Sequence, residues 1–201
     1  MGAIVVPFRG TGGKRRLTGL SHGLHERVVL AMLADVLAAA TAVARTAVVT
    51  GDARGRELAR ASGAETIEDP GGGQGAAVAA ALGLLPAGSV LVLNADLPCV
   101  VPYDLRSLLA STPPGGIALV ESSDGRTNAL SLPAPDLFQP LYGARSARRF
   151  RKAAQEVGLE AITVAIPNLV DDVDTREDLE RVHARLGPHT NAALQTVAGV
   201  S

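Results

Sequence analysis

The sequence predicts an α/β fold with a mainly parallel sheet. Short apolar and β-branched runs alternate with longer segments rich in Ala and Leu, as strands alternate with helices in folds of this class. The run Ser89–Asn94 (SVLVLN) is apolar through its centre, which indicates a strand that is buried on both faces. A length of 201 residues suits one domain that can bury a full core.

The predicted strands are short runs in which Val, Ile, Leu and Ala predominate. In chain order they are Ala3–Pro7, Thr46–Thr50, Glu65–Glu68, Ser89–Asn94, Ile117–Glu121, Asn128–Leu132 and Ala161–Ile166. Ligands bind at the carboxyl ends of the strands in such sheets. The residues that directly follow these strands are therefore the first candidates for a site.

The predicted helices are longer segments that have a boundary signal at one end. They are Leu24–Ala44, Ala53–Ser62, Gln74–Leu84, Pro102–Ala110, Ser146–Val157 and Thr175–Leu186. Ser21, Ser146 and Thr175 are expected to be N-caps, and Gly63 is expected to end the second helix. No linker divides the chain, so residues 1–186 are predicted to form one domain. Residues 187–201 are expected to be a frayed tail.

The composition excludes several classes of partner. Lys and Arg number 19 and Asp and Glu 20, so the net charge is −1, and charge does not drive the chain onto nucleic acid or an anionic membrane. The most apolar stretch, Val28–Ala44, contains Asp35 and is too short to span a bilayer. The single cysteine, Cys99, excludes an internal disulfide. We expect a soluble cytoplasmic protein without a nucleic-acid or membrane partner.

A glycine-rich, basic loop follows the first strand. Residues 9–17 read RGTGGKRRL, and this is not a Walker A loop because Arg15 replaces the Ser or Thr that would hold magnesium. Flexible backbone and cations at the carboxyl end of a strand suit a polyphosphate. The predicted phosphate-binding residues of this loop are Arg9, Gly10, Gly12, Gly13, Lys14 and Arg16. The alternative is a solvated basic loop.

A carboxylate directly follows the buried strand, in the sequence Asn-Ala-Asp-Leu-Pro at 94–98. A hard oxygen ligand held at the end of a strand suits Mg²⁺, so Asp96 is predicted to bind this metal. The alternative is an Asp that only caps the following turn. Asp172 and Asp174 precede the last predicted helix and could approach the same ion. We assign Asp174 as the second ligand, with Asp172 as the alternative.

Two later loops offer groups for a second ligand. Thr127 and Asn128 lie at the start of a predicted strand and can form side-chain hydrogen bonds there. Gly143 and Ser146 lie at the start of a basic helix, where backbone N–H groups favour an anion. The alternatives are a plain Asp-Gly turn before Thr127 and a solvated basic helix after Gly143.

Residues 71–76 (GGGQGA) also fit a dinucleotide-binding pattern. They match G-x-G-x-x-A before a helix, and Asp96 lies 20 residues after Ala76, where a ribose-binding acid would be expected. However, that pattern belongs after the first strand of the fold, and other predicted strands precede this loop. Dinucleotide binding is therefore the weaker interpretation.

Taken together, these motifs resemble the MobA-like nucleotidyltransferases. Within them, the chain is most similar to the guanylyltransferases of coenzyme F-420 biosynthesis that act on phosphoenolpyruvate or 2-phospho-L-lactate. The motifs that carry the resemblance are VPFRGTGGKRRL, AMLADVL, NADLP, DGRTNAL, YGARS and DVDTREDL. The specific pair is DGRTNAL followed by YGARS. The resemblance implies a single three-layer α/β/α domain of Rossmann-like type.

The resemblance also implies an activity. Family members transfer GMP from GTP to the phosphate of a small phosphorylated carboxylic acid and release pyrophosphate, with Mg²⁺ as cofactor. It assigns catalysis to Lys14, Arg16 and Asp96, and nucleotide binding also to Gly73 and Gly75. It assigns acceptor binding to Thr127, Gly143 and Ser146. We add Asn128, which follows Thr127, to these predicted acceptor-binding residues. The acceptor oxygen would attack the α-phosphorus directly, so no protein nucleophile is expected.

Departures from the family pattern keep alternatives open. Asn94 stands where some members carry an acidic residue, and Gln74 and Gly75 replace Leu and Asn of the usual nucleotide loop. The alternatives are another MobA-like transferase, acting on molybdopterin or a sugar phosphate, and a catalytically silent nucleotide-binding protein. The acceptor could be phosphoenolpyruvate, 2-phospho-L-lactate or 3-phosphoglycerate. A homodimer is compatible with the sequence.

Overall fold

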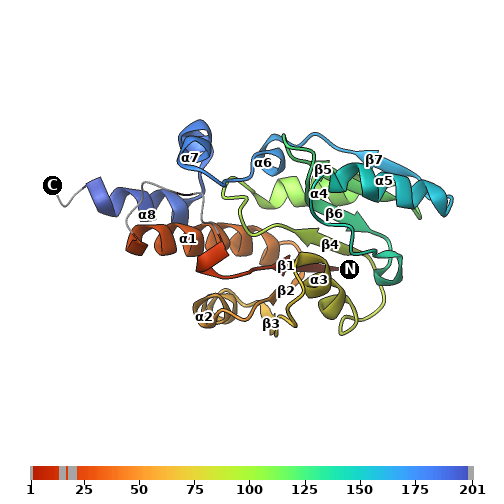
Figure 1. Cartoon of the computed structure of the whole chain (residues 1–201), viewed down its shortest axis with the longest axis horizontal. Coiled ribbons are helices and arrows are strands. Elements are labelled where there is room, and N and C mark those ends of the chain that lie inside the picture. Colours follow the sequence, from red (N-terminus) through yellow and green to blue (C-terminus); the bar gives the residue numbers. More distant parts are fainter. Residues whose placement is uncertain (1, 14–16, 18–21, 199–201) are drawn as a thin grey trace.

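A seven-stranded sheet forms the middle layer of the protein, and helices cover both of its faces (Figure 1). The computed structural model describes residues 2–13, 17 and 22–198. The strands are β1 (Ala3–Pro7), β2 (Arg45–Val49), β3 (Glu65–Ile67), β4 (Val90–Leu93), β5 (Ile117–Glu121), β6 (Thr127–Leu132) and β7 (Ala161–Thr163). Their order in the sheet is β3-β2-β1-β4-β6-β5-β7.

Strand β6 makes the sheet mixed. It pairs antiparallel with β4 and β5, whereas the other neighbouring strands are parallel. The predicted mainly parallel sheet is thus confirmed. Because β6 runs backwards, its first residues, Thr127 and Asn128, lie where β4 ends, and the N–H of Asn94 donates to the carbonyl of Asn128 at 2.9 Å.

The α-helices in the described residues agree with most of the predicted ones. They are α1 (His22–Thr41), α2 (Ala53–Ala61), α3 (Gln74–Leu82), α4 (Pro102–Ser111), α5 (Ser146–Glu156), α6 (Pro167–Val170), α7 (Arg176–Val182) and α8 (Pro188–Ala198). Short 3₁₀ turns are η1 (Thr11–Gly13), η2 (Pro135–Leu137) and η3 (His183–Arg185). No helix within the described ranges is long and apolar enough to cross a membrane.

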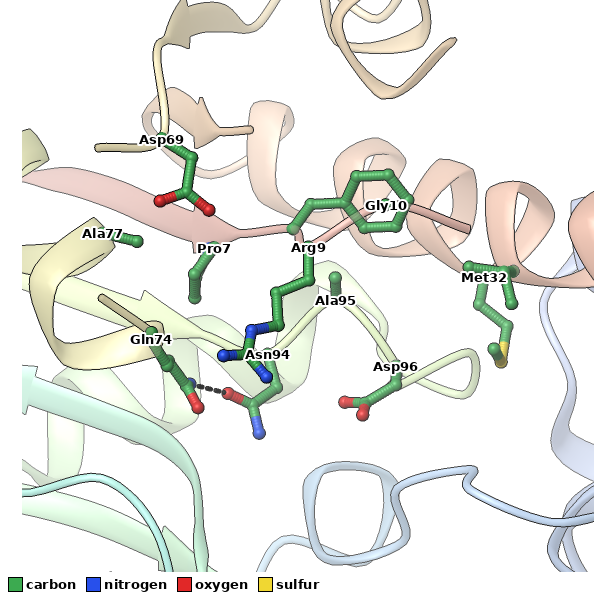
Figure 2. Close-up of a pocket in the computed structure, with 13 residues that line it drawn as sticks. Pro7, Arg9, Gly10, Met32, Asp69, Gln74, Ala77, Asn94, Ala95 and Asp96 are labelled. Atoms are coloured by element: carbon green, nitrogen blue, oxygen red, sulfur yellow. Dashed lines mark hydrogen bonds between the residues drawn. The ribbon is translucent and has the colours of Figure 1, made fainter. Parts of the chain in front are cut away.

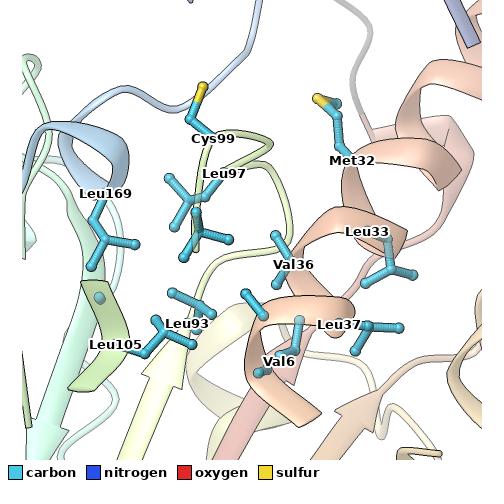
Figure 3. Packing of buried hydrophobic residues seen from close by; sticks show 14 of the residues in the cluster. Val6, Met32, Leu33, Val36, Leu37, Leu93, Leu97, Cys99, Leu105 and Leu169 are labelled. Atoms are coloured by element: carbon cyan, nitrogen blue, oxygen red, sulfur yellow. The ribbon is translucent and has the colours of Figure 1, made fainter. Parts of the chain in front are cut away.

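The two faces of β4 pack into different helical layers. Leu91 and Leu93 belong to a buried cluster with side chains of α1, α2, α4, α6 and α7, part of which is seen in Figure 3. Val90 and Val92 belong to a second cluster, with α3 and α5. All four side chains are buried, as the uninterrupted apolar run predicts. The arrangement is the three-layer architecture that the sequence predicts.

The last predicted helix is divided in the structure. Thr175 is its N-cap, as expected, and it shares a capping box with Asp178. Helix α7 then ends at Val182, and the 3₁₀ turn η3 follows. The short helix α6 was not predicted, because its four residues are too few for a periodic pattern.

The expected frayed tail is wrong for residues 188–198, which form α8 beside α1 (Figure 1). Asp35 of α1, whose exposed fraction is 3%, accepts hydrogen bonds from the backbone N–H groups of His189 and Thr190, both at 2.9 Å. A carboxylate at the start of a helix satisfies N–H groups that have no partner within the helix. Asp35 therefore caps α8 from another helix, an arrangement that local sequence cannot indicate.

Replacing Asp35 with Ala should destabilise the protein. The change leaves two N–H groups of α8 without this charged acceptor, so we expect the free energy of unfolding to fall by about 2–4 kcal/mol. Urea denaturation followed by circular dichroism measures the effect, and the exposed Asp136 provides the control substitution, Asp136→Ala. Wild-type stability in Asp35→Ala would show that the cap does not hold α8.

Candidate functional site

A pocket of about 150 Å³ opens at the carboxyl ends of β1 and β4 (Figure 2). It lies between the first loop, the start of α3 and the segment that follows β4. Its lining residues are Pro7, Phe8, Arg9, Gly10, Val29, Met32, Asp69, Gly73, Gln74, Ala77, Asn94, Ala95 and Asp96. The site thus lies at the edge of the sheet where ligands bind in α/β folds.

The first loop is held in place by Asp52, the N-cap of α2. One carboxylate oxygen of Asp52 accepts from the N–H of Gly55 at 2.8 Å, and the other from the N–H of Thr11 at 3.3 Å. Gly10 has a φ of +92°, and a Cβ there would lie 2.6 Å from the Asp52 carboxylate. Only glycine fits this position. Asp52 was not among the predicted site residues, although it closely follows β2, at a strand end of the kind that marks candidate sites.

Arg9 places a positive charge in the pocket. Its guanidinium points toward Gln74 and Asn94 (Figure 2), and one of its terminal nitrogens would lie 3.5 Å from a Cβ at Gly73. Gly73 has a φ of +94° and directly precedes α3. An exposed cation facing the start of a helix suits a phosphate chain. Lys14 and Arg16, which were predicted to be catalytic, lie outside the described residues.

The other predicted glycines are placed differently. Gly12 lies in η1, where a Cβ would meet no atom within 4 Å, and Gly13 ends the same turn. Gly75 does not line the pocket, and a Cβ there would lie 2.7 Å from the Cβ of Pro140. The close approach of the β6–α5 connection therefore explains this glycine. The nucleotide-loop pattern could not indicate the contact between Gly75 and Pro140, because Pro140 lies outside that loop.

Three carboxylates meet beside the pocket. One oxygen from each of Asp96, Asp172 and Asp174 lies within 4.8 Å of the others. The two segments that carry them are joined by a 3.0 Å hydrogen bond from the N–H of Val173 to the carbonyl of Asp96. Three carboxylates from half-buried residues form a donor set that fits a hard divalent cation such as Mg²⁺. The structure brings Asp172 to this cluster as well as the predicted pair.

Amide side chains connect the pocket to this carboxylate cluster. Gln74 Nε2 donates to Asn94 Oδ1 at 2.7 Å, as Figure 2 shows. Asn94 Nδ2 donates to Asn128 Oδ1 at 3.2 Å, and Asn128 Nδ2 donates to Asp172 Oδ1, also at 3.2 Å. In the sequence, Gln74 and Asn94 stood out only as departures from the family pattern. Their partners come from different elements, so spacing along the chain could not reveal the connection.

The predicted acceptor residues lie at the starts of β6 and α5. Ser146 Oγ donates to Thr127 Oγ1 at 3.0 Å, and both side chains are buried. Gly143 is exposed and has a φ of +113°. Ser146 is not the N-cap that was predicted. The N-cap is Arg145, whose backbone is in the left-handed region. The hydroxyl of Ser146 therefore does not cap the helix and contacts β6 instead.

The positions of residues 71–76 and of Cys99 exclude two kinds of chemistry at this site. The loop at 71–76 follows β3, an edge strand, and not the first strand, while Asp96 belongs to the carboxylate cluster. These positions do not match a dinucleotide fingerprint. Cys99 is buried, and burial raises the pKa of its thiol to about 11. A thiol with so high a pKa stays protonated at neutral pH, so Cys99 is unsuited to be a nucleophile.

Comparisons with known proteins agree with the family resemblance of the sequence motifs. A family model described as the MobA-like NTP transferase domain matches residues 15–192. A phosphoenolpyruvate guanylyltransferase of Nocardia farcinica is 36% identical, over 97% of this chain and 91% of that protein. A 3-phospho-D-glycerate guanylyltransferase of Phenylobacterium zucineum is 35% identical, over 90% and 88%. A putative nucleotide-diphospho-sugar transferase from Desulfovibrio desulfuricans has a TM-score of 0.76 at 17% identity, over 98% and 95%, and shares the fold.

Divalent cations should stabilise the protein through the carboxylate cluster. We expect Mg²⁺ to raise the melting temperature of the wild type and to do so less in Asp174→Asn, because one charged oxygen ligand is lost. A tenfold weaker affinity would remove about 1.4 kcal/mol of the stabilisation at saturating metal. Differential scanning fluorimetry with and without Mg²⁺ measures this, with Asp136→Asn as control. An equal Mg²⁺ effect in both variants would contradict a metal site at Asp174.

Proposed function

Because the chain belongs to the MobA-like NTP transferase family and is a nucleotidyltransferase, we propose that it transfers GMP from GTP to phosphoenolpyruvate and releases pyrophosphate. The observation that carries this proposal is the match, over nearly the whole chain, to relatives named phosphoenolpyruvate guanylyltransferase. The family resemblance supports a role in coenzyme F-420 biosynthesis. Both substrates are soluble metabolites, so we propose that the protein works in the cytoplasm.

A second acceptor is favoured by a specific observation. The relative named 3-phospho-D-glycerate guanylyltransferase is almost as similar, at 35% identity. Phosphoenolpyruvate, 2-phospho-L-lactate and 3-phosphoglycerate each carry one phosphate and one carboxylate, so the same groups of the protein could hold any of them. The choice among them is made by contacts to the carbon skeleton.

We assign the nucleotide to the pocket at β1 and β4. Arg9 and the backbone of Gly10 and Gly73 would face its phosphates, and Lys14 and Arg16 would add positive charge. Asp96, Asp172 and Asp174 would hold Mg²⁺, which when bound neutralises phosphate charge and orients the triphosphate. This assignment requires no metal ligand from outside the carboxylate cluster.

We assign the acceptor to the starts of β6 and α5. Ser146 donates its hydroxyl hydrogen to Thr127, so the hydroxyl hydrogen of Thr127 can point to an anion. The exposed backbone at Gly143 offers a further contact. These groups would hold the carboxylate of the acceptor and aim its phosphate at the nucleotide.

The chemistry then needs no nucleophile from the protein. A phosphate oxygen of the acceptor forms a bond to the α-phosphorus of GTP, and the bond to the bridging oxygen breaks. The electron pair leaves with pyrophosphate. The acceptor is already anionic, so no base has to remove a proton. The protein contributes positioning and positive charge, which are the main sources of catalysis in phosphoryl transfer.

Pyrophosphate release tests the proposed reaction. GTP, Mg²⁺ and one acceptor are supplied in separate assays, and we expect the fastest release with phosphoenolpyruvate. Asp96→Ala should lower kcat by about 100-fold or more and remain folded by circular dichroism, whereas Asp136→Ala should match the wild type. Full activity in Asp96→Ala would rule out the metal role. Silence with all three acceptors, while GTP still raises the melting temperature, would favour the silent nucleotide-binding protein.

Ser146→Ala tests the acceptor assignment. The substitution removes the hydroxyl that supports Thr127, so we expect the KM for the acceptor to rise about 3–10-fold, as for the loss of one hydrogen bond. The KM for GTP should change less. Steady-state kinetics with each substrate varied in turn measures both values, and Ser111→Ala at the exposed end of α4 is the control. Equal rises in the two KM values would argue against an acceptor site.

A further inference from the structure

We infer that Asn128 is a positioning residue for the metal ligand Asp172, and not an acceptor-binding residue. The inference rests on the proposed metal role of the carboxylate cluster and deepens it. Asn128 was predicted to contact the acceptor because it lies beside Thr127 at the start of β6. Its side-chain contacts lead instead toward the carboxylates.

The amide of Asn128 is surrounded by partners from two segments, residues 169–172 and the end of β4. Its Nδ2 lies 3.0 Å from the carbonyl of Leu169, 3.1 Å from that of Val170 and 3.2 Å from Asp172 Oδ1. Its Oδ1 accepts from Asn94 Nδ2. The exposed fraction of Asn128 is 2%, so water has little access to replace these contacts. Side chains that are both buried and fully hydrogen-bonded are held in one orientation.

The direction of the hydrogen bonds strengthens this argument. Each amide donates to the next, from Gln74 to Asn94 to Asn128, and the last donates to a carboxylate. An ionised carboxylate can only accept. A reversed Asn128 amide would place its Oδ1 against three other oxygens. Asp172 and the two carbonyls therefore determine the orientation of Asn128, and Asn128 in turn restrains Asp172.

Asp172 needs such restraint because of where it lies. It is in the connection between α6 and α7, outside both helices, so no helix or strand sets the direction of its side chain. Metal binding is strong when the ligands are already oriented before the ion binds. Replacing the residues that form hydrogen bonds with metal ligands typically lowers metal affinity by about 10–100-fold. Asn128 supplies this restraint from the rigid sheet, because it belongs to β6.

Metal binding without substrates tests the inference. Mn²⁺ is titrated into the full chain, and the free ion is measured by electron paramagnetic resonance. We expect Asn128→Ala to bind Mn²⁺ about 10–100-fold more weakly than the wild type. At saturating metal, its acceptor KM should be unchanged. Asn128→Ser, which keeps a hydroxyl among the buried carbonyls, should show the same loss and serves if Asn128→Ala does not fold.

Asn168→Ala is the matched control. Asn168 lies on α6 and forms hydrogen bonds with Asp104 and Arg185. Its replacement therefore weakens the attachment of the same segment but keeps the hydrogen bond between Asn128 and Asp172. We expect its Mn²⁺ affinity to stay near that of the wild type. An equal loss of affinity in Asn168→Ala would overturn the inference, because general loosening of the segment would then explain the result.

A double-substitution cycle shows whether Asn128 acts through Asp172. If it does, adding Asn128→Ala to Asp172→Asn should weaken Mn²⁺ binding no further. Additive losses would overturn the inference. So would wild-type Mn²⁺ affinity in Asn128→Ala together with a raised acceptor KM, which would restore the acceptor role. If the wild type binds no Mn²⁺, the proposed metal role fails as well, and the two failures are thereby distinguished.

Discussion

The antiparallel pairing of β6 with β4 is the constraint on which the site depends. In a wholly parallel sheet, the residues that begin a strand lie at the edge opposite to the ligands. Here β6 returns from β5 through a tight turn, and Thr127 and Asn128 arrive beside the carboxyl end of β4. The pairing brings together the pocket at β1 and β4, the carboxylate cluster and the hydroxyl pair of Thr127 and Ser146. The reversed direction of β6 thus brings residues from both halves of the chain to the same edge of the sheet.

The C-terminal third of the chain supports the segment after β4. The N–H of Val173 donates to the carbonyl of Asp96, and the N–H of Gly187 donates to that of Pro98 at 2.8 Å. Asp35 then caps α8. These contacts surround the turn that carries Asp96 and oppose its movement away from the other two carboxylates. Carboxylates held close together repel one another, and these contacts oppose that repulsion.

The fold by itself does not decide the reaction. Solved structures that share this fold at identities below 25% are named as a nucleotide-diphospho-sugar transferase, a synthetase and a synthase, as expected for a scaffold whose function lies in its site. The side chains at the site limit the kinds of ligand that this protein can bind. Three carboxylates beside a pocket with an exposed arginine suit a nucleotide with bound metal, and buried hydroxyls nearby suit a small anion. The similarity in sequence to named guanylyltransferases then indicates guanylyl transfer among the reactions that this geometry permits.

The sequence by itself determined the order of elements, the buried character of β4 and the position of Asp96 at the carboxyl end of this strand, because these depend on local periodicity and on position after a strand. It also placed Thr127 at the entrance of a strand and Gly143 and Ser146 at the start of a helix, and the motif resemblance assigned all three to the acceptor. Only the tertiary structure decided that Asp172 joins the cluster, that Asn128 faces it, that Gly75 contacts Pro140 and that residues 188–198 form a docked helix. Each of these depends on a partner distant in the chain. Spacing along one segment carries no information about such a partner, because the sheet order and the reversal of β6 set that distance in space.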